Sequence, residues 1–151
     1  MNTIRVTHIA GDALHELIAV LDAAKLPTVD ILNGGRDFFR FEDHALVGFA
    51  GIEGNGPDRL LRSVVVVPSR RSVGAGSALV AALERLAVSQ GVERLHLLTT
   101  TARAFFERCG YRMAERTTAP TAVTGSAEFR SLCPASASYL VKTIGGADAA
   151  A

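Results

Sequence analysis

The chain has 151 residues, of which 48% are hydrophobic and 21% charged, and its formal net charge at pH 7 is +1. A chain of this length can bury enough surface to fold as one domain, and its ordinary composition excludes a disordered or fibrous protein. The near balance of acidic and basic residues argues against a nucleic-acid partner, which a strongly basic surface would attract.

The cysteines and the absence of long apolar stretches indicate the cellular compartment in which the protein is expected. No stretch reaches the roughly 18 apolar residues of a membrane span, and the first residues lack the pattern of an export signal. We therefore expect a cytoplasmic protein with no membrane partner, in which Cys109 and Cys133 are free thiols. Residues 1–144 are predicted to form a single domain, and 145–151, which have little to bury, a disordered tail.

Strand and helix patterns alternate from the N-terminus. Residues 3–9 predict a strand and 13–24 a helix, because apolar side chains recur there at the strand and helix periods. The connection 25–35 is predicted to hold a short helix capped by Thr28. Two β-rich runs then predict an antiparallel hairpin, at 37–42 and 45–52.

The second half of the chain continues this alternation. Residues 60–67 are nearly all apolar and β-branched, which is typical of a central strand covered on both faces. Residues 75–90 predict a long helix, and 94–98 a strand. The remaining predicted elements are a helix at 102–108 capped by Thr101, a strand at 111–114, a helical turn at 127–132 and a strand at 139–144. No repeat or linker divides the chain, so the pattern predicts one α/β sheet covered by helices.

The most informative segment joins the Val-rich strand to the long helix. It reads Val64-Val-Val-Val-Pro68-Ser-Arg-Arg71-Ser72-Val73-Gly74-Ala75-Gly76-Ser77. The first amides of a helix have no intrahelical acceptor and the helix dipole is positive there, so this segment predicts a phosphate or diphosphate site. The Walker and dinucleotide patterns fail, because no Gly-Lys-Ser/Thr follows and Leu79 replaces the third glycine. A purely structural turn is the alternative.

The spacing Arg71-x-x-Gly74-x-Gly76 after Pro68 resembles the acetyl-CoA signature of the GCN5-related N-acetyltransferase (GNAT) superfamily. The likeness continues through Phe105-Phe106 to Gly110-Tyr111. It implies the acyl-CoA N-acyltransferase fold, with a mixed, mostly antiparallel central sheet and helices on both faces. Four shorter segments resemble the superfamily's arsenic-resistance branch: Leu26-Pro-Thr-x-Asp30, Leu61-Arg-Ser63, Leu97-Leu-Thr-Thr-Thr-Ala102, and Glu128-Phe129 with Leu132-Cys-Pro134.

This resemblance implies acetyl-CoA as cosubstrate. The backbone of the Val-rich strand would pair with the pantetheine arm, and the loop amides would hold the diphosphate. Phe105 and Phe106 are assigned to the cofactor by their place in the motif, although aromatic pairs of this kind are more often core residues. The predicted cofactor contacts are Val65, Val66, Val67, Arg71, Ser72, Val73, Gly74, Ala75, Gly76, Ser77, Phe105 and Phe106.

The chemistry of transfer needs a proton acceptor for the amine. Glu53 is the first candidate, because a carboxylate or a water chain must take the proton of the attacking nitrogen. Phe106 stands where many relatives carry a tyrosine that protonates the departing thiolate. A thiol with a pKa of about 8.5 leaves as a tolerable anion, so water, Thr99, Thr100 or Tyr139 could assist. The predicted catalytic residues are Glu53, Thr99 and Tyr139.

The acceptor is expected to be an amino acid or an analogue. Arg62 is a polar residue within an apolar strand, and its guanidinium could bind a substrate carboxylate. A partner carboxylate within the protein explains Arg62 nearly as well. The predicted substrate contacts are Arg62, Ser63, Thr100 and Phe39. The four histidines share no ligand spacing, so no metal site is predicted.

These observations predict an acetyl-CoA-dependent N-acetyltransferase that transfers directly, in a ternary complex, to the amino group of a small molecule. The branch resemblance implies a role in arsenic resistance. Two alternatives stay open: a non-catalytic acetyl-CoA-binding or sensor module, and a protein N-acetyltransferase. The exposed strand edges are compatible with a homodimer.

Overall fold

The computed structural model describes residues 3–71, 74–132 and 136–146. The strands are β1 (Arg5–Ile9), β2 (Arg36–Glu42), β3 (Leu46–Glu53), β4 (Asp58–Val66), β5 (Arg94–Thr99), β6 (Arg112–Met113) and β7 (Ser138–Thr143). The helices are α1 (Leu14–Ala23), α2 (Ala75–Ser89), α3 (Arg103–Arg108) and α4 (Thr121–Thr124), with a π-helical turn at Glu128–Leu132. Short 3-10 turns occupy Gly11–Ala13, Pro68–Arg70 and Arg116–Thr118.

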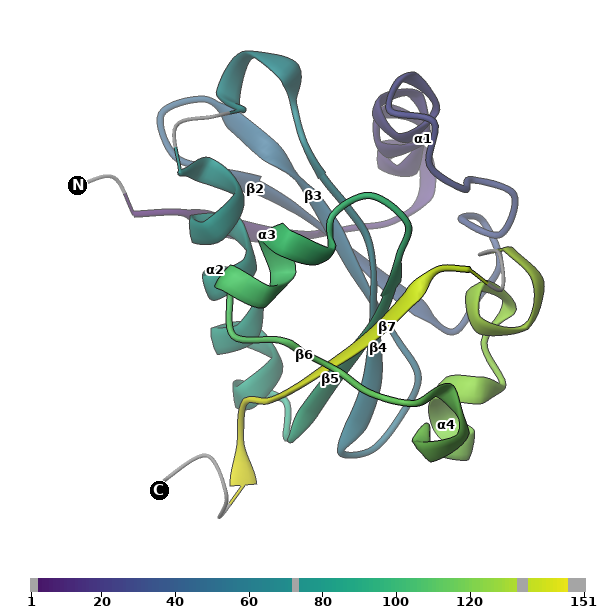
Figure 1. Ribbon diagram of the computed structural model, residues 1–151. Coiled ribbons are helices and arrows are strands. Elements are labelled where there is room, and N and C mark those ends of the chain that lie inside the picture. Colours follow the sequence, from purple (N-terminus) through teal and green to yellow (C-terminus); the bar gives the residue numbers. More distant parts are fainter. Residues whose placement is uncertain (1–2, 72–73, 133–135, 147–151) are drawn as a thin grey trace. The chain divides into compact units, whose positions relative to one another are not determined.

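The seven strands form one mixed sheet in the order β1-β2-β3-β4-β5-β7-β6 (Figure 1). β1 runs antiparallel to β2, and β7 runs antiparallel to both β5 and β6. β4 and β5 are parallel, with 58–60 paired to 94–96. The predicted α/β fold with a mixed central sheet is therefore confirmed.

The chain forms two compact units. The first unit consists of 1–52 and 63–85, and the second of 53–62 and 86–151. β4 contributes its second half to the first unit and its first half to the second.

The first unit has an apolar core between α1 and its strands. Leu17 and Leu21 lie one helical turn apart on α1 and are fully buried, as the helix period requires of a core-facing stripe. Phe38, Phe49 and Val65 pack into the same cluster from β2, β3 and β4. Burial of each such side chain stabilises the unit by roughly 1.5–3 kcal/mol. This core holds the end of β4 in place.

β3 and β4 approach each other closely at Gly48. A Cβ atom at this position would lie 2.0 Å from the backbone oxygen of Val65. Only a glycine fits such a contact, because real Cβ atoms do not come that close to a carbonyl oxygen. The Val-rich segment is thus fixed against β3.

The second unit is organised around β5 and β7. All six residues of β5 pair with β7, and Leu97 lies opposite Leu140. Leu95, Leu97 and Leu140 are buried on one face of the pair, as is Tyr111, which follows α3. The opposite face carries the polar side chains of the candidate site, because successive side chains of a strand point to opposite faces.

Two predicted elements differ from the structure. The helix predicted within 25–35 is wrong, because the segment 28–35 consists of turns and bends. Thr28 donates its hydroxyl to Asp22 Oδ1 at 3.1 Å instead of capping a helix, and Asp30 pairs with Arg36 at 3.2 Å. The helical turn predicted at 127–132 is a π-helix.

The chain fold extends past the predicted boundary at residue 144. Gly145 is buried, and its amide donates to the carbonyl of Glu93 at 3.2 Å. Residues 147–151 of the predicted tail, and Cys133, lie outside the described residues, and Cys109 forms no disulfide with any described residue. Within the described part of the chain, no helix combines the length and apolar character that a membrane crossing needs.

Candidate functional site

In the first unit, the segment after β4 leads to the N-terminus of α2. The amide of Ala78 donates to the carbonyl of Gly74 at 3.2 Å. The amides of Ala75, Gly76 and Ser77 precede it in the first turn, where helix amides generally lack an intrahelical acceptor. Gly74 has a φ of +77°, and a Cβ there would meet nothing within 4 Å. The start of this 15-residue helix therefore has the chemistry that could hold an anion, and the predicted diphosphate contacts there stay a prediction.

Two arginines lie on the loop that leads to this helix. Arg70 donates from Nη1 to Asp43 Oδ1 at 3.0 Å and from Nη2 to Asp43 Oδ2 at 2.5 Å. These bonds hold the pKa of the Asp43 carboxyl well below its usual value. Arg71 is exposed and donates from Nε to the carbonyl of Val66 at 2.8 Å. Arg70 thus anchors the loop on the β2–β3 turn, and Arg71 is tied to the end of β4. The predicted contacts Ser72 and Val73 lie outside the described residues.

The three predicted valine contacts differ in where their backbone groups point. The amide of Val67 donates to the carbonyl of Val47 on β3 at 3.0 Å, and the oxygen of Val65 lies against Gly48 of the same strand. Backbone groups of successive strand residues alternate between the two edges. Val66 therefore presents its N–H and C=O on the edge away from β3, where the C=O accepts from Arg71, and its N–H best suits an added extended ligand.

In the second unit, Arg62 lies in a buried ionic cluster. Its guanidinium binds Glu53 Oε1 at 2.9 Å and Glu128 Oε2 at 3.2 Å, and the Arg62 side chain is fully buried. Glu128 enters the cluster from the first residue of the π-helical turn, an element that often occurs at functional sites. These are the partner carboxylates that the alternative interpretation of Arg62 required. A contact of Arg62 with substrate remains a prediction, as does the role of Glu53 as proton acceptor.

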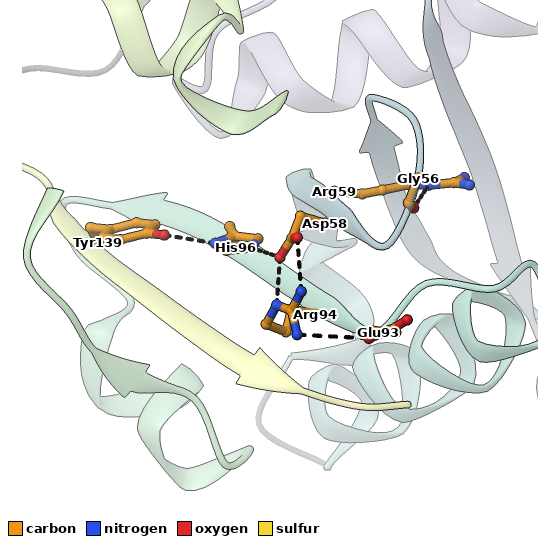
Figure 2. Close-up of polar contacts among 7 residues, drawn as sticks. All are labelled: Gly56, Asp58, Arg59, Glu93, Arg94, His96 and Tyr139. Atoms are coloured by element: carbon orange, nitrogen blue, oxygen red, sulfur yellow. Dashed lines mark hydrogen bonds and ion pairs between the residues drawn. The ribbon is translucent and has the colours of Figure 1, made fainter. Parts of the chain in front are cut away.

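A second polar chain crosses the sheet from β4 through β5 to β7 (Figure 2). Arg94 donates to both oxygens of Asp58, at 2.6 and 2.9 Å. His96 Nε2 lies 2.8 Å from Asp58 Oδ1, and His96 Nδ1 lies 2.7 Å from the hydroxyl of Tyr139. An ionised carboxylate only accepts hydrogen bonds, so Nε2 carries the proton toward Asp58. In the neutral ring, Nδ1 then accepts from the Tyr139 hydroxyl.

The protonation equilibria of this chain follow from its contacts and its burial. The Arg94 guanidinium lowers the pKa of Asp58, and the bond from His96 adds to the effect. Burial lowers the pKa of His96, which Asp58 partly opposes. Burial raises the pKa of Tyr139 to about 12. At neutral pH the chain thus holds an ionised carboxylate, a neutral imidazole and a protonated phenol.

The two threonines predicted at the end of β5 have different surroundings. Thr99 accepts a hydrogen bond from the amide of Ala102 through Oγ1, at 2.9 Å. It therefore binds the start of α3, and the cap predicted at Thr101 is wrong. Thr100 is exposed.

Phe106, Phe39 and Ser63 are the remaining predicted site residues. Phe106 is buried and packs edge to face on Phe105 and Tyr111, as a core aromatic does. Phe39 is only 4% exposed and contacts His8. Ser63 adopts a φ of +56° within β4, a conformation that is uncommon for residues other than glycine. Their roles toward cofactor or substrate stay predictions.

Four residues of these two polar groups are absent from the predicted site: Asp58, Arg94, His96 and Glu128. His96 stands in an apolar run and gives no signal without the register of β5 against β7. Glu128 is far from Arg62 in sequence. Asp58 and Arg94 are each the first residue of a strand, and this shared position is the sequence signal that could indicate their ion pair.

Residues 12–111 match the family model described as the Acetyltransferase (GNAT) family. The chain belongs to this family. The match includes residues 71–77, so the predicted diphosphate loop of this GNAT chain lies within the region that identifies the family. No curated protein matches the chain in sequence.

Solved structures share the fold of this GNAT chain at low sequence identity. N-acetylglutamate synthase from Neisseria gonorrhoeae, complexed with coenzyme A and L-arginine, has 18% identity and a TM-score of 0.76 over 97% of this chain and 34% of that one. Rv2747 from Mycobacterium tuberculosis, in complex with CoA and NLQ, has 20% identity and a TM-score of 0.73 over 93% and 99%. A putative acyl-CoA N-acyltransferase from Klebsiella pneumoniae has 24% identity and a TM-score of 0.67 over 94% and 98%. This GNAT chain therefore spans about a third of the length of the Neisseria synthase.

Within the described residues of this GNAT chain, no three His, Cys, Asp or Glu side chains gather in an arrangement that could hold a metal ion.

Proposed function

We propose that this GNAT chain is an acetyl-CoA-dependent N-acetyltransferase that acts on the amino group of a small molecule, an amino acid or an analogue of one. The observation that carries the proposal is the sequence of backbone donors along one segment of the first unit. The outward-facing groups of Val66 are followed by Arg71 and then by the first amides of α2. This order suits an extended arm that ends in a diphosphate.

Acetyl-CoA supplies the thioester whose acetyl group is transferred. The amides from Gly74 to Ser77, together with Arg71, would bind its diphosphate, and the open space at Gly74 lets the backbone approach the phosphates closely. Val66 would pair with the pantetheine amides, and its N–H would donate to the thioester carbonyl as charge develops on that oxygen. Ser72 and Val73 complete the proposed loop.

Transfer is direct. The neutral amine attacks the thioester carbon, a C–N bond forms, the C–S bond breaks, and the CoA thiolate leaves. A thiolate with a conjugate acid pKa of about 8.5 needs little help to depart, so the buried Phe106 in place of a proton donor is no obstacle. The amine must still lose a proton, and Glu53 is the proposed acceptor.

An amino acid is the proposed acceptor class for two reasons. The solved structures of similar fold include N-acetylglutamate synthase in complex with coenzyme A and N-acetyl-glutamate, although this chain covers only 35% of that one. Four short segments of the sequence, among them Leu61-Arg-Ser63, resemble the arsenic-resistance branch. We therefore propose an arsenic- or phosphorus-containing amino acid as the preferred acceptor, with an ordinary amino acid as the next candidate.

A non-catalytic acetyl-CoA-binding module is the second candidate function. The observation that favours it is Phe106, which cannot donate a proton and is buried among Phe105 and Tyr111. Such a module would bind acetyl-CoA and release no thiol with any amine.

Thiol release from acetyl-CoA tests the proposal. A thiol-reactive dye would follow CoA formation with a panel of ordinary amino acids, phosphinothricin and an arsenical amino acid. Release that depends on one amine class, and that Arg71→Glu abolishes, would support the enzyme and give its acceptor class. Arg85→Glu is the matched control, because Arg85 is exposed on the same helix at the far end from the loop. Tight binding of acetyl-CoA without release for any amine would favour the binding module.

A further inference from the structure

Arg70 and Arg71 are adjacent in the first unit, but their side chains bind different segments of it. The Arg70 guanidinium donates to both oxygens of Asp43 in the β2–β3 turn, at 3.0 and 2.5 Å. Arg71 donates from Nε to the carbonyl of Val66 at the end of β4. The side chains of Arg70 and Asp43 are 18% and 8% exposed, whereas Arg71 is an exposed residue. The charge of Arg70 is thus matched by a carboxylate within the same unit.

The pair of Arg70 and Asp43 is held by further bonds to the same turn. Arg70 Nη1 also donates to the carbonyls of Ala45 and Leu46, at 3.3 and 3.5 Å. Asp43 Oδ1 accepts a hydrogen bond from the amide of Ala45 at 3.1 Å. A guanidinium that binds a carboxylate through two parallel bonds keeps one orientation. The pair therefore forms a rigid link between the β2–β3 turn and the 3-10 turn Pro68–Arg70.

The 3-10 turn carries this constraint to the backbone of Arg71. The amide of Arg70 donates to the carbonyl of Val67 at 2.9 Å, and the amide of Arg71 to that of Pro68 at 3.4 Å. The amide of Val67 is itself bound to Val47 on β3. The turn is thus fixed to β3 at its start and to the β2–β3 turn at its end. A fixed backbone limits the directions that the Arg71 side chain can take, which lowers the entropic cost of binding a ligand.

We propose that Arg70 and Asp43 are positioning residues for acetyl-CoA, which hold the turn so that Arg71 meets the diphosphate, and that Arg70 itself does not contact the cofactor. This inference rests on the proposed function, and within it on the proposed cofactor loop. The bonds from Arg70 hold the pKa of Asp43 well below its usual value, so the ion pair is intact at neutral pH. His44 Nδ1 lies 3.2 Å from Asp43 Oδ1, and protonation of this exposed ring would leave the Asp43 carboxylate ionised.

Positioning and simple attraction of charge predict opposite effects for the same substitutions. If Arg70 acted only through its charge, Asp43→Asn would release that charge and strengthen the binding of acetyl-CoA. If Arg70 positions the turn, Asp43→Asn removes its anchor and weakens binding, although the net positive charge near the loop rises. Arg70→Lys separates the two roles again, because lysine keeps the charge but cannot form two parallel bonds with a carboxylate.

Calorimetry of acetyl-CoA binding tests the inference, with Asp12→Asn and Arg85→Lys as matched controls at exposed positions of the same unit. We expect Asp43→Asn and Arg70→Lys to weaken binding about fivefold or more, and the controls to stay within about twofold of the wild type. In the Arg71→Gln background, Arg70→Lys should change the affinity by less than about twofold, because the side chain that the pair positions is gone. A merely structural role of Arg70 would not depend on Arg71.

Asp43→Asn keeps the inference falsifiable if Arg70→Lys does not fold, and circular dichroism establishes the folded state of each variant. Equal or tighter binding by Asp43→Asn overturns the inference, as does a loss in Arg70→Lys that is the same with and without Arg71. Either result leaves the proposed function standing, provided that the wild type binds acetyl-CoA. If the wild type does not bind acetyl-CoA, the proposed function fails and the positioning role falls with it.

Discussion

Arg71 donates its Nε proton to the backbone carbonyl of Val66 at 2.8 Å, and so links the loop to the strand residue whose backbone faces away from β3. The two proposed contacts for the cofactor, the extended arm at Val66 and the diphosphate at the start of α2, are thereby held by one side chain. A guanidinium can make this bond through Nε and still direct its terminal nitrogens toward phosphate oxygens.

Reversal of this charge is expected to weaken acetyl-CoA binding. Arg71→Glu removes the link to Val66 and places a carboxylate beside the diphosphate, so affinity should fall about 10- to 100-fold, which corresponds to roughly 1.4–2.8 kcal/mol. Isothermal titration calorimetry measures this change. Arg85→Glu, at the other end of α2, should bind acetyl-CoA as the wild type does. Equal affinity in Arg71→Glu would mean that the loop does not hold the diphosphate.

Gly48 is expected to be intolerant of even one methyl group. In Gly48→Ala the new Cβ would start 2.0 Å from the oxygen of Val65, so β3 and β4 must separate, at a cost of about 3 kcal/mol or more. Urea unfolding followed by circular dichroism gives the loss. Gly34→Ala, where a Cβ meets nothing within 4 Å, should be neutral or slightly stabilising. Similar stabilities for the two variants would argue against the close contact.

The buried Arg62 cluster is expected to be sensitive to loss of its cation. Arg62→Met leaves Glu53 and Glu128 without the guanidinium that the structure places between them, which should lower the free energy of unfolding by roughly 3–5 kcal/mol. Adding Glu53→Gln and Glu128→Gln removes the uncompensated charges and should recover part of that loss. If the free energy of unfolding of Arg62→Met falls by less than about 1 kcal/mol, the guanidinium does not compensate the charges of the two carboxylates.

Tyr139 gives the stability a defined dependence on alkaline pH. Its pKa is raised from 10.0 to about 12, so between these values the unfolded chain has lost the phenolic proton and the folded protein has kept it. The free energy of unfolding therefore falls as pH rises through this window, and the contribution is fully present below it. Tm measured from pH 9 to 12 should fall more steeply in the wild type than in Tyr139→Phe. Parallel curves would show that the phenol does not titrate abnormally.

Much of the fold and of the loop site could be predicted from local patterns. The Val-rich run, the helix that follows Gly74 and the basic residues between them are contiguous, so periodicity and the end chemistry of a helix suffice to place them. The short helix predicted at Thr28 fails for a local reason as well, because the Thr28 hydroxyl has Asp22 within reach. Local propensity does not reveal such a competing partner.

The polar groups of the second unit could not be predicted in the same way. Arg62 is unusual within an apolar strand, but its partner Glu128 comes from a π-helical turn, which has no distinctive sequence pattern. His96 meets Tyr139 only because Leu98 lies opposite Tyr139 in the register of β5 and β7. A one-residue shift of that register would place His96 and Tyr139 on opposite faces. These side-chain contacts therefore follow from strand pairing.

The central claim, transfer of an acetyl group from acetyl-CoA to a small amine, is tested most directly by mass spectrometry of the product. The enzyme would be incubated with isotopically labelled acetyl-CoA and each amine of the panel, and both CoA and the labelled N-acetyl product would be quantified. We predict one labelled N-acetyl product for each CoA formed with one class of amino acid, and neither with Arg71→Glu. Release of CoA without an acetylated amine, or no product from any amine although acetyl-CoA binds, would contradict the account.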